Sequence, residues 1–308
     1  GQLILDPFCG VGTVPLEADL MERVGIGFDL NPYAATISMA KFDRHPLEEC
    51  LYWLKSVKID LEQVNVDEIS PAIRQYFHEK TLKELYALRK EIFEGNKIFI
   101  LGCVLGILHG HRPGHLSVYT SLVVPFKPRD KPPYKEVIPR VIDKVKRTYR
   151  NAFPLNTKSF ALLGDARRIP LPEESVDAVI SSPPYYNTLD YVKDNRLRLE
   201  FLGYNDSARD YLNRILIQNP KDYLDHMEKV GIELMKTLKP EGLCIYVLGD
   251  CHKGKRHINT AEHVSLIYEK IGFTKYAIIE DEMPPNPSFP TSYKRKKLDR
   301  ILVMQKPK

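Results

Sequence analysis

The start of the chain alternates between strand and helix patterns, and this alternation limits the fold more than any other feature. The apolar run LILD, residues 3–6, leads through the turn PFCGVG to a helical pattern over PLEADLMERV, residues 15–24. A second apolar run, IGFDL at 26–30, leads through Asn-Pro to another helical pattern, YAATISMAKF. We expect Thr13 to cap the first helix and Gly25 to stop it. A strand–helix–strand start of this kind favours a parallel, doubly wound sheet.

The alternation then stops and resumes more than halfway along the chain. Residues 47–155 are mostly helical in pattern and basic, with helices expected over Ser70–Phe77 and Lys80–Glu94. After them, the strand patterns FALLGDA, VDAVISS and GLCIYVLGD alternate with helical patterns, and TKYAIIED and RILVMQK close the chain. The sequence therefore predicts a doubly wound, mostly parallel seven-stranded sheet from residues 1–46 and 156–308, with a helical, basic insertion at 47–155.

Composition argues against a membrane protein and against a disulfide-stabilised domain. Hydrophobic residues make up 43% and charged residues 28% of the 308 residues, as in ordinary globular proteins. The longest apolar run, near Ile98–Leu108, is far shorter than the roughly 20 residues of a membrane-spanning helix. The five cysteines are scattered without the paired spacing of metal ligands. We therefore expect a cytoplasmic protein with no membrane association, no disulfide framework and no metal site.

The chain carries a net charge of +5, and two of its stretches are strongly basic. Such clusters bind nucleic acid phosphates, although for each cluster a solvated surface explains the charge equally well. If the first interpretation holds, the nucleic-acid-binding residues are Lys127, Arg129, Lys131, Lys144, Arg147, Lys294, Arg295 and Lys296.

The turn DPFCGVGT, residues 6–13, has the composition of a ligand-binding turn. Gly10 and Gly12 permit positive φ angles and a close backbone approach to a ligand, and the helix that follows has a partly positive N-terminus. The turn lacks the Lys-Ser/Thr pair of a phosphate-binding P-loop, which argues against an ATPase. Asp29 ends the second strand, where doubly wound nucleotide-binding folds bind ribose hydroxyls; an ordinary turn or cap residue would also fit there.

Two further strand ends carry polar or aromatic residues. Asp165 follows the strand FALLG and is placed to accept a hydrogen bond from an adenine amino group. The next strand ends in Ser182-Pro183-Pro184-Tyr185, because prolines cannot donate to a sheet ladder. The carboxyl ends of parallel strands meet at one crevice, so we expect all these residues to surround a single ligand site.

These motifs resemble those of the S-adenosylmethionine-dependent amino-methyltransferases, which methylate exocyclic nitrogens of DNA bases. DPFCGVGT resembles their cofactor motif, Asp29 matches their ribose-binding acid, and Asp165 matches their adenine-contacting acid. The resemblance covers residues 2–46 and 159–307, and HGHRPGHLSVYTSLVVPF is also similar to a segment of site-specific DNA methyltransferases. It implies S-adenosylmethionine as cofactor, held by Asp6, Pro7, Phe8, Cys9, Gly10, Gly12, Thr13, Asp29, Leu30, Asp165 and Ala166. The family's catalytic tetrapeptide, (D/N/S)-P-P-(Y/F/W), corresponds to Ser182, Pro183, Pro184 and Tyr185.

The chemistry of amine methylation explains this tetrapeptide. The lone pair of an exocyclic amine is delocalised into the ring, so the nitrogen is a poor nucleophile. The Ser182 hydroxyl and the Pro183 carbonyl can accept hydrogen bonds from the two N–H groups and aim the lone pair at the methyl group. Fixed proline φ angles hold that carbonyl in place. Tyr185 would stack on a base that has been rotated out of the duplex.

We therefore expect a site-specific DNA methyltransferase that acts on double-stranded DNA, with a cognate restriction endonuclease as a partner that the resemblance allows. Serine in the first catalytic position favours cytosine N4, and adenine N6 is the second possibility. Two further functions are compatible with the same residues: an RNA base-amine methyltransferase, and a non-catalytic nucleic-acid-binding protein on the same scaffold. The sequence does not determine the oligomeric state.

The order of motifs, with the cofactor motif first and the catalytic motif later, resembles the alpha arrangement of the family, in which an insertion recognises the target. Here the insertion at 47–155 precedes the Asp165 segment instead of following it. Family members with this order also carry a cofactor-lining segment ahead of the glycine-rich turn. Because the chain starts on the first strand, either it is a piece of a longer protein or that segment is supplied elsewhere.

Overall fold

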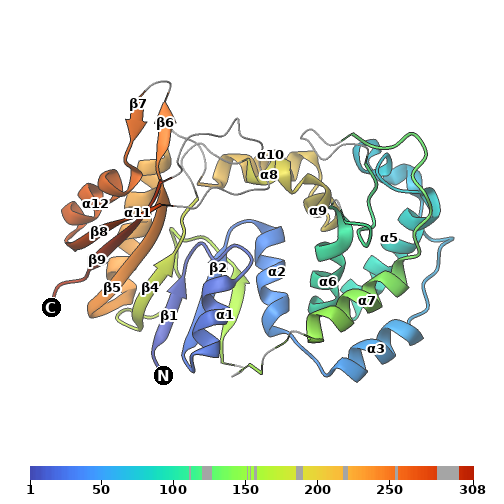
Figure 1. The fold of residues 1–308 in the computed structure, drawn as a ribbon, viewed down its shortest axis with the longest axis horizontal. Helices are drawn as coiled ribbons and strands as arrows, with labels where there is room; N and C mark the ends of the chain where they lie inside the picture. The colour runs from blue at the N-terminus through green and yellow to red at the C-terminus, as the bar shows by residue number, and fades with distance from the viewer. Residues whose placement is uncertain are drawn as a thin grey trace. The chain divides into compact units, whose positions relative to one another are not determined.

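The computed structural model of the chain contains one seven-stranded sheet with the order β3-β2-β1-β4-β5-β9-β8 (Figure 1). It describes residues 1–110, 112–119, 127–150, 152, 154–155, 158–184, 190–217, 221–253, 256–282 and 298–308. The strands of this sheet are β1 Leu3–Asp6, β2 Val24–Asp29, β3 Phe160–Leu163, β4 Val176–Ser181, β5 Leu238–Gly249, β8 Thr274–Glu282 and β9 Leu298–Gln305. The first five run parallel, whereas β9 is antiparallel to both β5 and β8. The predicted doubly wound, mostly parallel, Rossmann-like sheet is confirmed.

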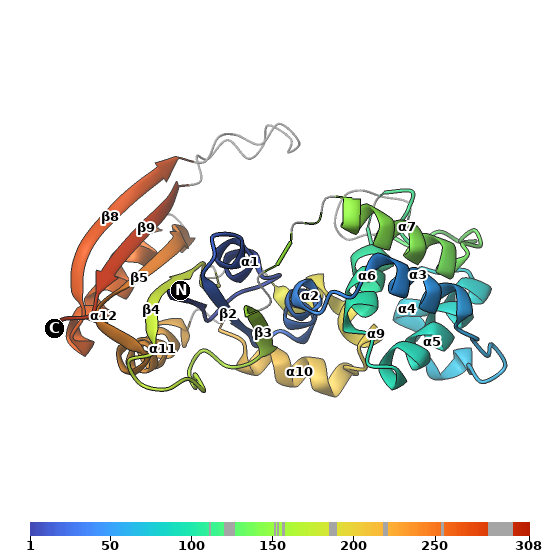
Figure 2. The same cartoon turned by 90° about the horizontal axis from the view of Figure 1, so that it is seen from below.

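The middle strands of the sheet are apolar because both of their faces are covered. Leu5, Val179 and Cys244 lie side by side on β1, β4 and β5 and are fully buried. Helix α1 lies on one face of the sheet and α11 on the other (Figure 2). Helices α11 and α12 pack against each other. The helices of this part of the chain are α1 Thr13–Leu20, α2 Pro32–Phe42, α8 Tyr191–Asp194, α10 Asp206–Ile215, α11 Tyr223–Thr237 and α12 Thr260–Ile271.

The boundaries of α1 differ from those expected. Gly12, with φ 80°, is the N-cap residue, and Thr13 is already the first residue of the helix. The helix ends at Leu20, and Gly25 lies in β2 instead of stopping α1. A Cβ atom on Gly25 would lie 2.3 Å from the Pro15 carbonyl oxygen, so glycine at this position lets β2 pack closely against α1.

The chain divides into two compact units, one of residues 1–38, 155–194 and 204–308 and the other of residues 39–154 and 195–203. The first contains the seven-stranded sheet and the small ribbon of β6 Cys251–Lys253 and β7 Arg256–Ile258. The second is helical and contains α3 Leu47–Ser56, the 3₁₀ turn Val66–Glu68, α4 Pro71–Arg74, α5 Glu79–Glu94, α6 Ile98–Leu108, α7 Val137–Arg150 and α9 Arg196–Phe201. Among the described residues, no helix is long and apolar enough to span a membrane.

The helical unit has its own apolar core. Leu88 of α5, Leu105 of α6 and Val141 of α7 are fully buried within it. The helix expected over Lys80–Glu94 is confirmed as α5, but the one expected over Ser70–Phe77 is reduced to α4. After α4, Tyr76 and Phe77 donate backbone hydrogen bonds to residues three positions earlier, so the chain leaves the α-helix in tighter turns.

Candidate active site at the carboxyl edge of the sheet

Strands β1 to β5 are parallel, so their carboxyl ends lie along one edge of the sheet (Figure 1). Asp6 and Asp29 are the last residues of β1 and β2, and Asp165 follows the end of β3. Ser181 ends β4 and is followed by Ser182. The described part of the predicted site is therefore assembled at one sheet edge, as expected for ligand crevices in doubly wound folds.

The glycine-rich turn is fixed by backbone hydrogen bonds. The Cys9 N–H donates to the Phe28 carbonyl at 2.8 Å, and the Gly12 N–H donates to the Cys9 carbonyl at 2.7 Å. Gly10 and Gly12 have φ angles of 51° and 80°, which favour glycine. A Cβ atom on Gly12 would lie 2.1 Å from Ser38 Oγ, whereas one on Gly10 would meet no atom within 4 Å. The turn thus packs tightly against α2 at Gly12 and has open space at Gly10.

Helix α1 starts directly from this turn without a side-chain cap. The first N–H groups of a helix have no partner within the helix and carry a partial positive charge. The N-terminus of α1 and the adjoining glycine-rich turn therefore present hydrogen-bond donors to a polar or anionic group.

Asp29 connects the turn to β2. Its Oδ2 accepts a hydrogen bond from the Gly10 N–H at 2.8 Å, and its Oδ1 accepts one from the Asn31 N–H at 2.8 Å. Burial raises the pKa of Asp29 to about 6, although both hydrogen bonds oppose this shift. A carboxylate has about four acceptor positions, so Asp29 retains acceptors for two further donors such as ribose hydroxyls.

Asp6 is buried beneath the turn and contacts Ser181 at the end of β4. Its Oδ1 accepts hydrogen bonds from the Ser181 hydroxyl at 2.5 Å and from the Phe8 N–H at 3.1 Å. Burial raises the pKa of Asp6 to about 7, and the nearby charge of Asp29 adds to this shift. This short hydrogen bond joins β4 to β1 at the sheet edge where the glycine-rich turn and the Ser-Pro-Pro-Tyr segment begin.

Ser182 is exposed, and its hydroxyl donates to the Val247 carbonyl of β5 at 3.2 Å. A hydroxyl has one donor and two acceptor positions, so the oxygen of Ser182 presents lone pairs to a ligand when its hydrogen is occupied in this way. Pro183 is buried and Pro184 is partly buried. Tyr185 lies outside the described residues.

Asp165 forms an ion pair with Arg167 that was not expected from the sequence. Arg167 donates three side-chain hydrogen bonds of 2.7 to 3.2 Å and one backbone hydrogen bond of 2.9 Å to the two carboxylate oxygens. Burial opposes ionisation of Asp165, but these hydrogen bonds outweigh it and its pKa is lowered. Arg167 also donates to the Ile215 carbonyl at 3.0 Å. In this arrangement the acceptor positions of Asp165 are filled, so an adenine amine would have to share them with Arg167.

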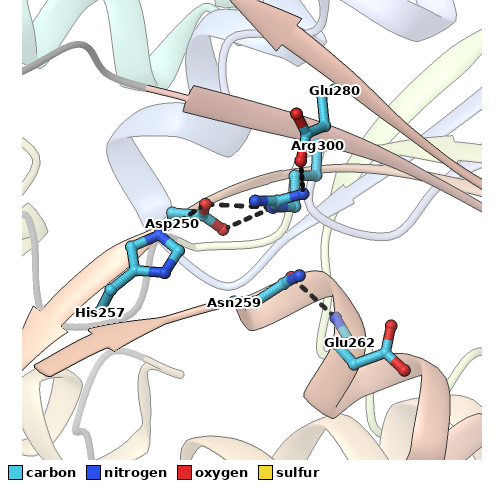
Figure 3. A network of polar contacts seen from close by, with 6 residues as sticks. All are labelled: Asp250, His257, Asn259, Glu262, Glu280 and Arg300. Atoms are coloured by element: carbon cyan, nitrogen blue, oxygen red, sulfur yellow. Dashed lines mark hydrogen bonds and ion pairs between the residues drawn. The ribbon is translucent and has the colours of Figure 1, made fainter.

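The carboxyl end of β5 is held by a second buried ion pair (Figure 3). Both oxygens of Asp250 lie 3.0 Å from Arg300 Nε, and Oδ2 lies 2.9 Å from His257 Nε2. Arg300 also pairs with Glu280. The side chain of Asp250 is only 4% exposed, and its carboxylate ties the end of β5 to β7 and β9.

The remaining predicted cofactor residues differ in exposure. Pro7, Cys9 and Ala166 are buried, Phe8 and Leu30 are partly buried, and Thr13 is exposed. The Cys9 thiol lies 3.6 Å from Ser38 Oγ, and burial raises its pKa well above the usual range. Buried residues in this set support the turn from below, whereas exposed ones can contact a ligand.

Most of the predicted nucleic-acid-binding residues that the structure describes are exposed. They are Lys127, Arg129, Lys131 and Arg147, while Lys144 is partly buried; Lys294, Arg295 and Lys296 lie outside the described residues. Among the described residues, no group of three or more His, Cys, Asp or Glu side chains is arranged to hold a metal ion.

Two residues of this edge were missed by sequence reasoning or left without a role. Arg167 stands two positions after Asp165 in a turn, a spacing that signals a local ion pair. Ser181, next to Ser182, was left without a role, although strand alternation points adjacent residues to opposite faces.

No profile of a known protein family and no curated protein sequence matches this chain. Among solved structures it is similar to a candidate DNA modification methylase of Thermus thermophilus, with 27% identity, a TM-score of 0.31 and coverage of 47% of this chain and 52% of that chain. The same protein complexed with S-adenosyl-L-methionine matches with 27% identity, a TM-score of 0.32 and coverage of 47% and 54%. A SAM-dependent methyltransferase of Methanosarcina mazei matches with 11% identity, a TM-score of 0.40 and coverage of 99% and 92%. The match to the Thermus protein spans about half the length of that protein.

Proposed function

We propose that this chain transfers a methyl group from S-adenosylmethionine to the exocyclic amine of a base rotated out of double-stranded DNA, with cytosine N4 as the favoured target. The observation that carries the proposal is the 2.5 Å hydrogen bond from Ser181 to Asp6. It joins the strand that ends in Ser-Pro-Pro-Tyr directly to the glycine-rich turn, so a donor molecule at the turn and a base at the tetrapeptide would be neighbours.

The residues at the turn suit S-adenosylmethionine. Gly10 borders open space, and the N-terminus of α1 has no side-chain cap. Asp29 retains acceptor positions for ribose hydroxyls while its hydrogen bond to Gly10 holds the turn in place. When bound, S-adenosylmethionine supplies an electrophilic methyl group on a sulfonium. We expect Gly10, Gly12 and Asp29 to bind it, and Asp6 to support the turn from below.

The Ser182 hydroxyl already donates its hydrogen, so its oxygen can act as the acceptor that the reaction needs. The base amine must present its lone pair, and this requires acceptors for its two N–H groups. Because the Ser182 hydrogen is directed to the Val247 carbonyl, its oxygen can accept one of them. The Pro183 carbonyl would accept the other. Methyl transfer would form the N–C bond as the methyl–sulfonium bond breaks and leaves a neutral thioether, and the methylated nitrogen, now acidic, would lose its proton to water. Positioning by these acceptors provides the rate enhancement, without a dedicated general base.

The proposal is tested by incubating the full chain with methyl-labelled S-adenosylmethionine and either duplex DNA or transfer RNA. We expect label in DNA only, and digestion to nucleosides followed by mass spectrometry should reveal N4-methylcytosine. N6-methyladenine would show that adenine is the target base, and label in transfer RNA alone would overturn the assignment to DNA. If calorimetry detects no binding of S-adenosylmethionine, the proposal that this chain transfers methyl groups is refuted, and a non-catalytic nucleic-acid-binding function gains support.

A further inference from the structure

Helix α7 has one apolar face and one basic face. Val137, Val141 and Val145 recur at helical spacing and are fully buried in the core of the helical unit. The opposite face carries Arg140, Asp143, Lys146, Arg147 and Arg150, which line an open groove of about 320 Å³ together with Gly114. The groove thus combines four basic side chains with one acidic side chain.

The position of α7 is fixed by a buried carboxylate. Glu84 of α5 is buried, and its Oε2 accepts a hydrogen bond from the Val137 N–H at 2.9 Å, at the first residue of α7. Its Oε1 accepts one from the Tyr134 hydroxyl at 2.5 Å. An anionic group at a helix N-terminus satisfies unpaired N–H groups and interacts favourably with the helix dipole. Glu84 therefore holds the start of α7 and with it the orientation of the basic face.

The loop on the other side of the groove is also fixed. The His115 N–H donates to the Arg112 carbonyl at 2.9 Å, and Leu116 and Ser117 donate to carbonyls at the end of α6. Lys135 Nζ donates to the His115 and Ser117 carbonyls, which joins the loop to the segment before α7. Both walls of the groove are therefore held by the fold, and no rearrangement is needed to form it.

The basic side chains of the groove are available to an anion. Lys146, Arg147 and Arg150 are exposed and Arg140 is partly exposed. Within the described part of the chain, no ion pair joins any of the four to a carboxylate. Lys144 is different, because a Cβ atom on Gly106 would lie 3.2 Å from its Cε, so its side chain lies over α6. Of the two residues of α7 predicted from the sequence to bind nucleic acid, Arg147 lines the groove and Lys144 does not.

We propose that this basic groove, defined by Arg140, Lys146, Arg147, Arg150 and Gly114, binds successive phosphates along one strand of duplex DNA. This inference deepens the proposed function, because it assigns the surface that would hold the DNA backbone. From Arg140 to Arg150 the helix rises about 15 Å, at 1.5 Å per residue. Successive phosphates of one strand rise about 3.4 Å along the B-DNA axis while they wind around it, so a row of basic side chains about 15 Å long can reach more than one of them. These contacts would position the DNA without reading its sequence.

The test measures binding of the full chain to a fluorescent duplex of mixed sequence at several salt concentrations, without a methyl donor. In the Arg147→Gln/Arg150→Gln variant we expect affinity to fall on the order of tenfold or more at 0.1 M salt. The slope of log K against log salt should become shallower by about 2, because each lost phosphate contact removes about 0.9. The control variant Lys229→Gln/Lys270→Gln removes the same charge from exposed positions on α11 and α12 and should retain the slope.

Arg147→Lys/Arg150→Lys should restore most of the affinity, which separates a charge effect from a folding defect. An unchanged slope in the glutamine variant, or equal losses in the α7 variant and its control, would overturn the proposal. Tighter binding of a structured RNA than of duplex DNA would overturn the assignment of the partner. DNA binding is measured here without S-adenosylmethionine. Absence of methyl transfer in the separate activity test would therefore refute the proposed function but would not affect the conclusion that the basic groove binds DNA.

Discussion

At the scale of single residues, the two adjacent serines at the end of β4 have different tasks. The Ser181 hydroxyl is buried and donates to Asp6, whereas the Ser182 hydroxyl is exposed and donates to a backbone carbonyl. Strand alternation directs them to opposite faces of the sheet, one toward the turn and one toward solvent. The strand end thus has one serine hydroxyl that supports the turn and one that is accessible from solvent.

Removal of the Ser182 hydroxyl should impair methyl transfer and leave cofactor binding intact. Loss of one pre-organised hydrogen bond to a reacting group lowers the rate on the order of 10² to 10³ in other enzymes, and we expect Ser182→Ala to lower kcat by about 10². The measurement is single-turnover transfer to DNA together with calorimetric binding of S-adenosylmethionine. Ser56→Ala is a matched control, since the Ser56 hydroxyl is also exposed and donates to a backbone carbonyl at 3.2 Å. Wild-type transfer by the Ser182 variant would refute the assignment.

The buried carboxyl group of Asp6 should make the stability of the protein depend on pH. Its pKa is about 7 in the folded protein and near 3.8 in the unfolded chain. Between these values the folded state binds more protons, so stability falls as the pH rises from about 4 to about 7. Asp29, whose pKa is about 6, also lowers the stability as the pH rises, but over a narrower pH range.

Asp6→Asn mimics the protonated carboxyl group and should reduce this dependence. The difference in free energy of unfolding between the variant and the wild type should shift in favour of the variant by on the order of 2 kcal/mol as the pH rises from 5 to 8. Ser181→Ala should have the opposite effect and extend the loss of stability to higher pH, because its hydrogen bond favours the ionised form of Asp6. Urea unfolding midpoints at both pH values provide the measurement. Parallel pH curves for wild type and Asp6→Asn would contradict the interpretation.

At the scale of secondary-structure elements, the glycine-rich turn provides a matched pair of substitutions. Gly12→Ala would place a Cβ atom 2.1 Å from Ser38 Oγ, and both Gly12 and Gly10 have positive φ angles. Positive φ alone costs about 1–2 kcal/mol for a residue with a side chain. We therefore expect Gly10→Ala to lower the free energy of unfolding by about that amount and Gly12→Ala to lower it by more. Thermal unfolding and S-adenosylmethionine affinity measure both effects, and equal losses in the two variants would show that packing against α2 is unimportant.

The ion pair at the end of β5 yields a second prediction at this scale. The Asp250 side chain is 4% and the Arg300 side chain is 11% exposed, so Arg300→Ala leaves a buried carboxylate beside His257 without its guanidinium partner. Removal of one partner of a buried pair costs about 3–5 kcal/mol. The double variant Asp250→Ala/Arg300→Ala should lose less than Arg300→Ala, because no charge remains buried. Lys308→Ala removes an exposed pair with Glu241 and should cost less than about 1 kcal/mol in the same urea experiment.

The sequence predicted the elements of the sheet because their signals are local. Apolar runs marked the strands, and the consecutive prolines marked the end of β4 at Ser181. Asp29 was recognised because it ends a strand, and the structure locates it against Gly10 of the turn. The assignment of cofactor and catalytic roles to these residues stays a prediction.

Interactions between distant segments could not be predicted in this way. The pair of Asp250 and Arg300 joins residues fifty positions apart, and the hydrogen bond from Ser181 to Asp6 spans 175 positions. No local pattern encodes such partners, because they are selected by the packing of the strands that carry them. The N-cap at Gly12 was missed for a different reason: side-chain preferences favour threonine, but the backbone conformation of the turn requires glycine.

At the scale of the whole molecule, the chain forms the sheet from segments that are far apart in sequence. β2 lies between β1 and β3, yet residues 30–159 separate it from β3 in the chain. Most of that intervening sequence forms the helical unit, which consists of the continuous stretch 39–154 together with residues 195–203. The architecture therefore combines a sheet whose β2–β3 pairing spans the whole insertion with a unit that comes mainly from one continuous stretch of the chain.

This topology determines the order in which the molecule can fold. During synthesis, β1 and β2 leave the ribosome on the order of ten seconds before β3, so the edge of β2 is unpaired for that time and open to association with other chains. Chains dominated by local contacts fold faster than those that must close long loops. In refolding from urea, the fluorescence of the sole tryptophan, Trp53 of α3, should therefore recover before hydrogen-exchange protection appears in β1 and β4. Simultaneous recovery of both signals would mean that the helical unit cannot fold ahead of the sheet.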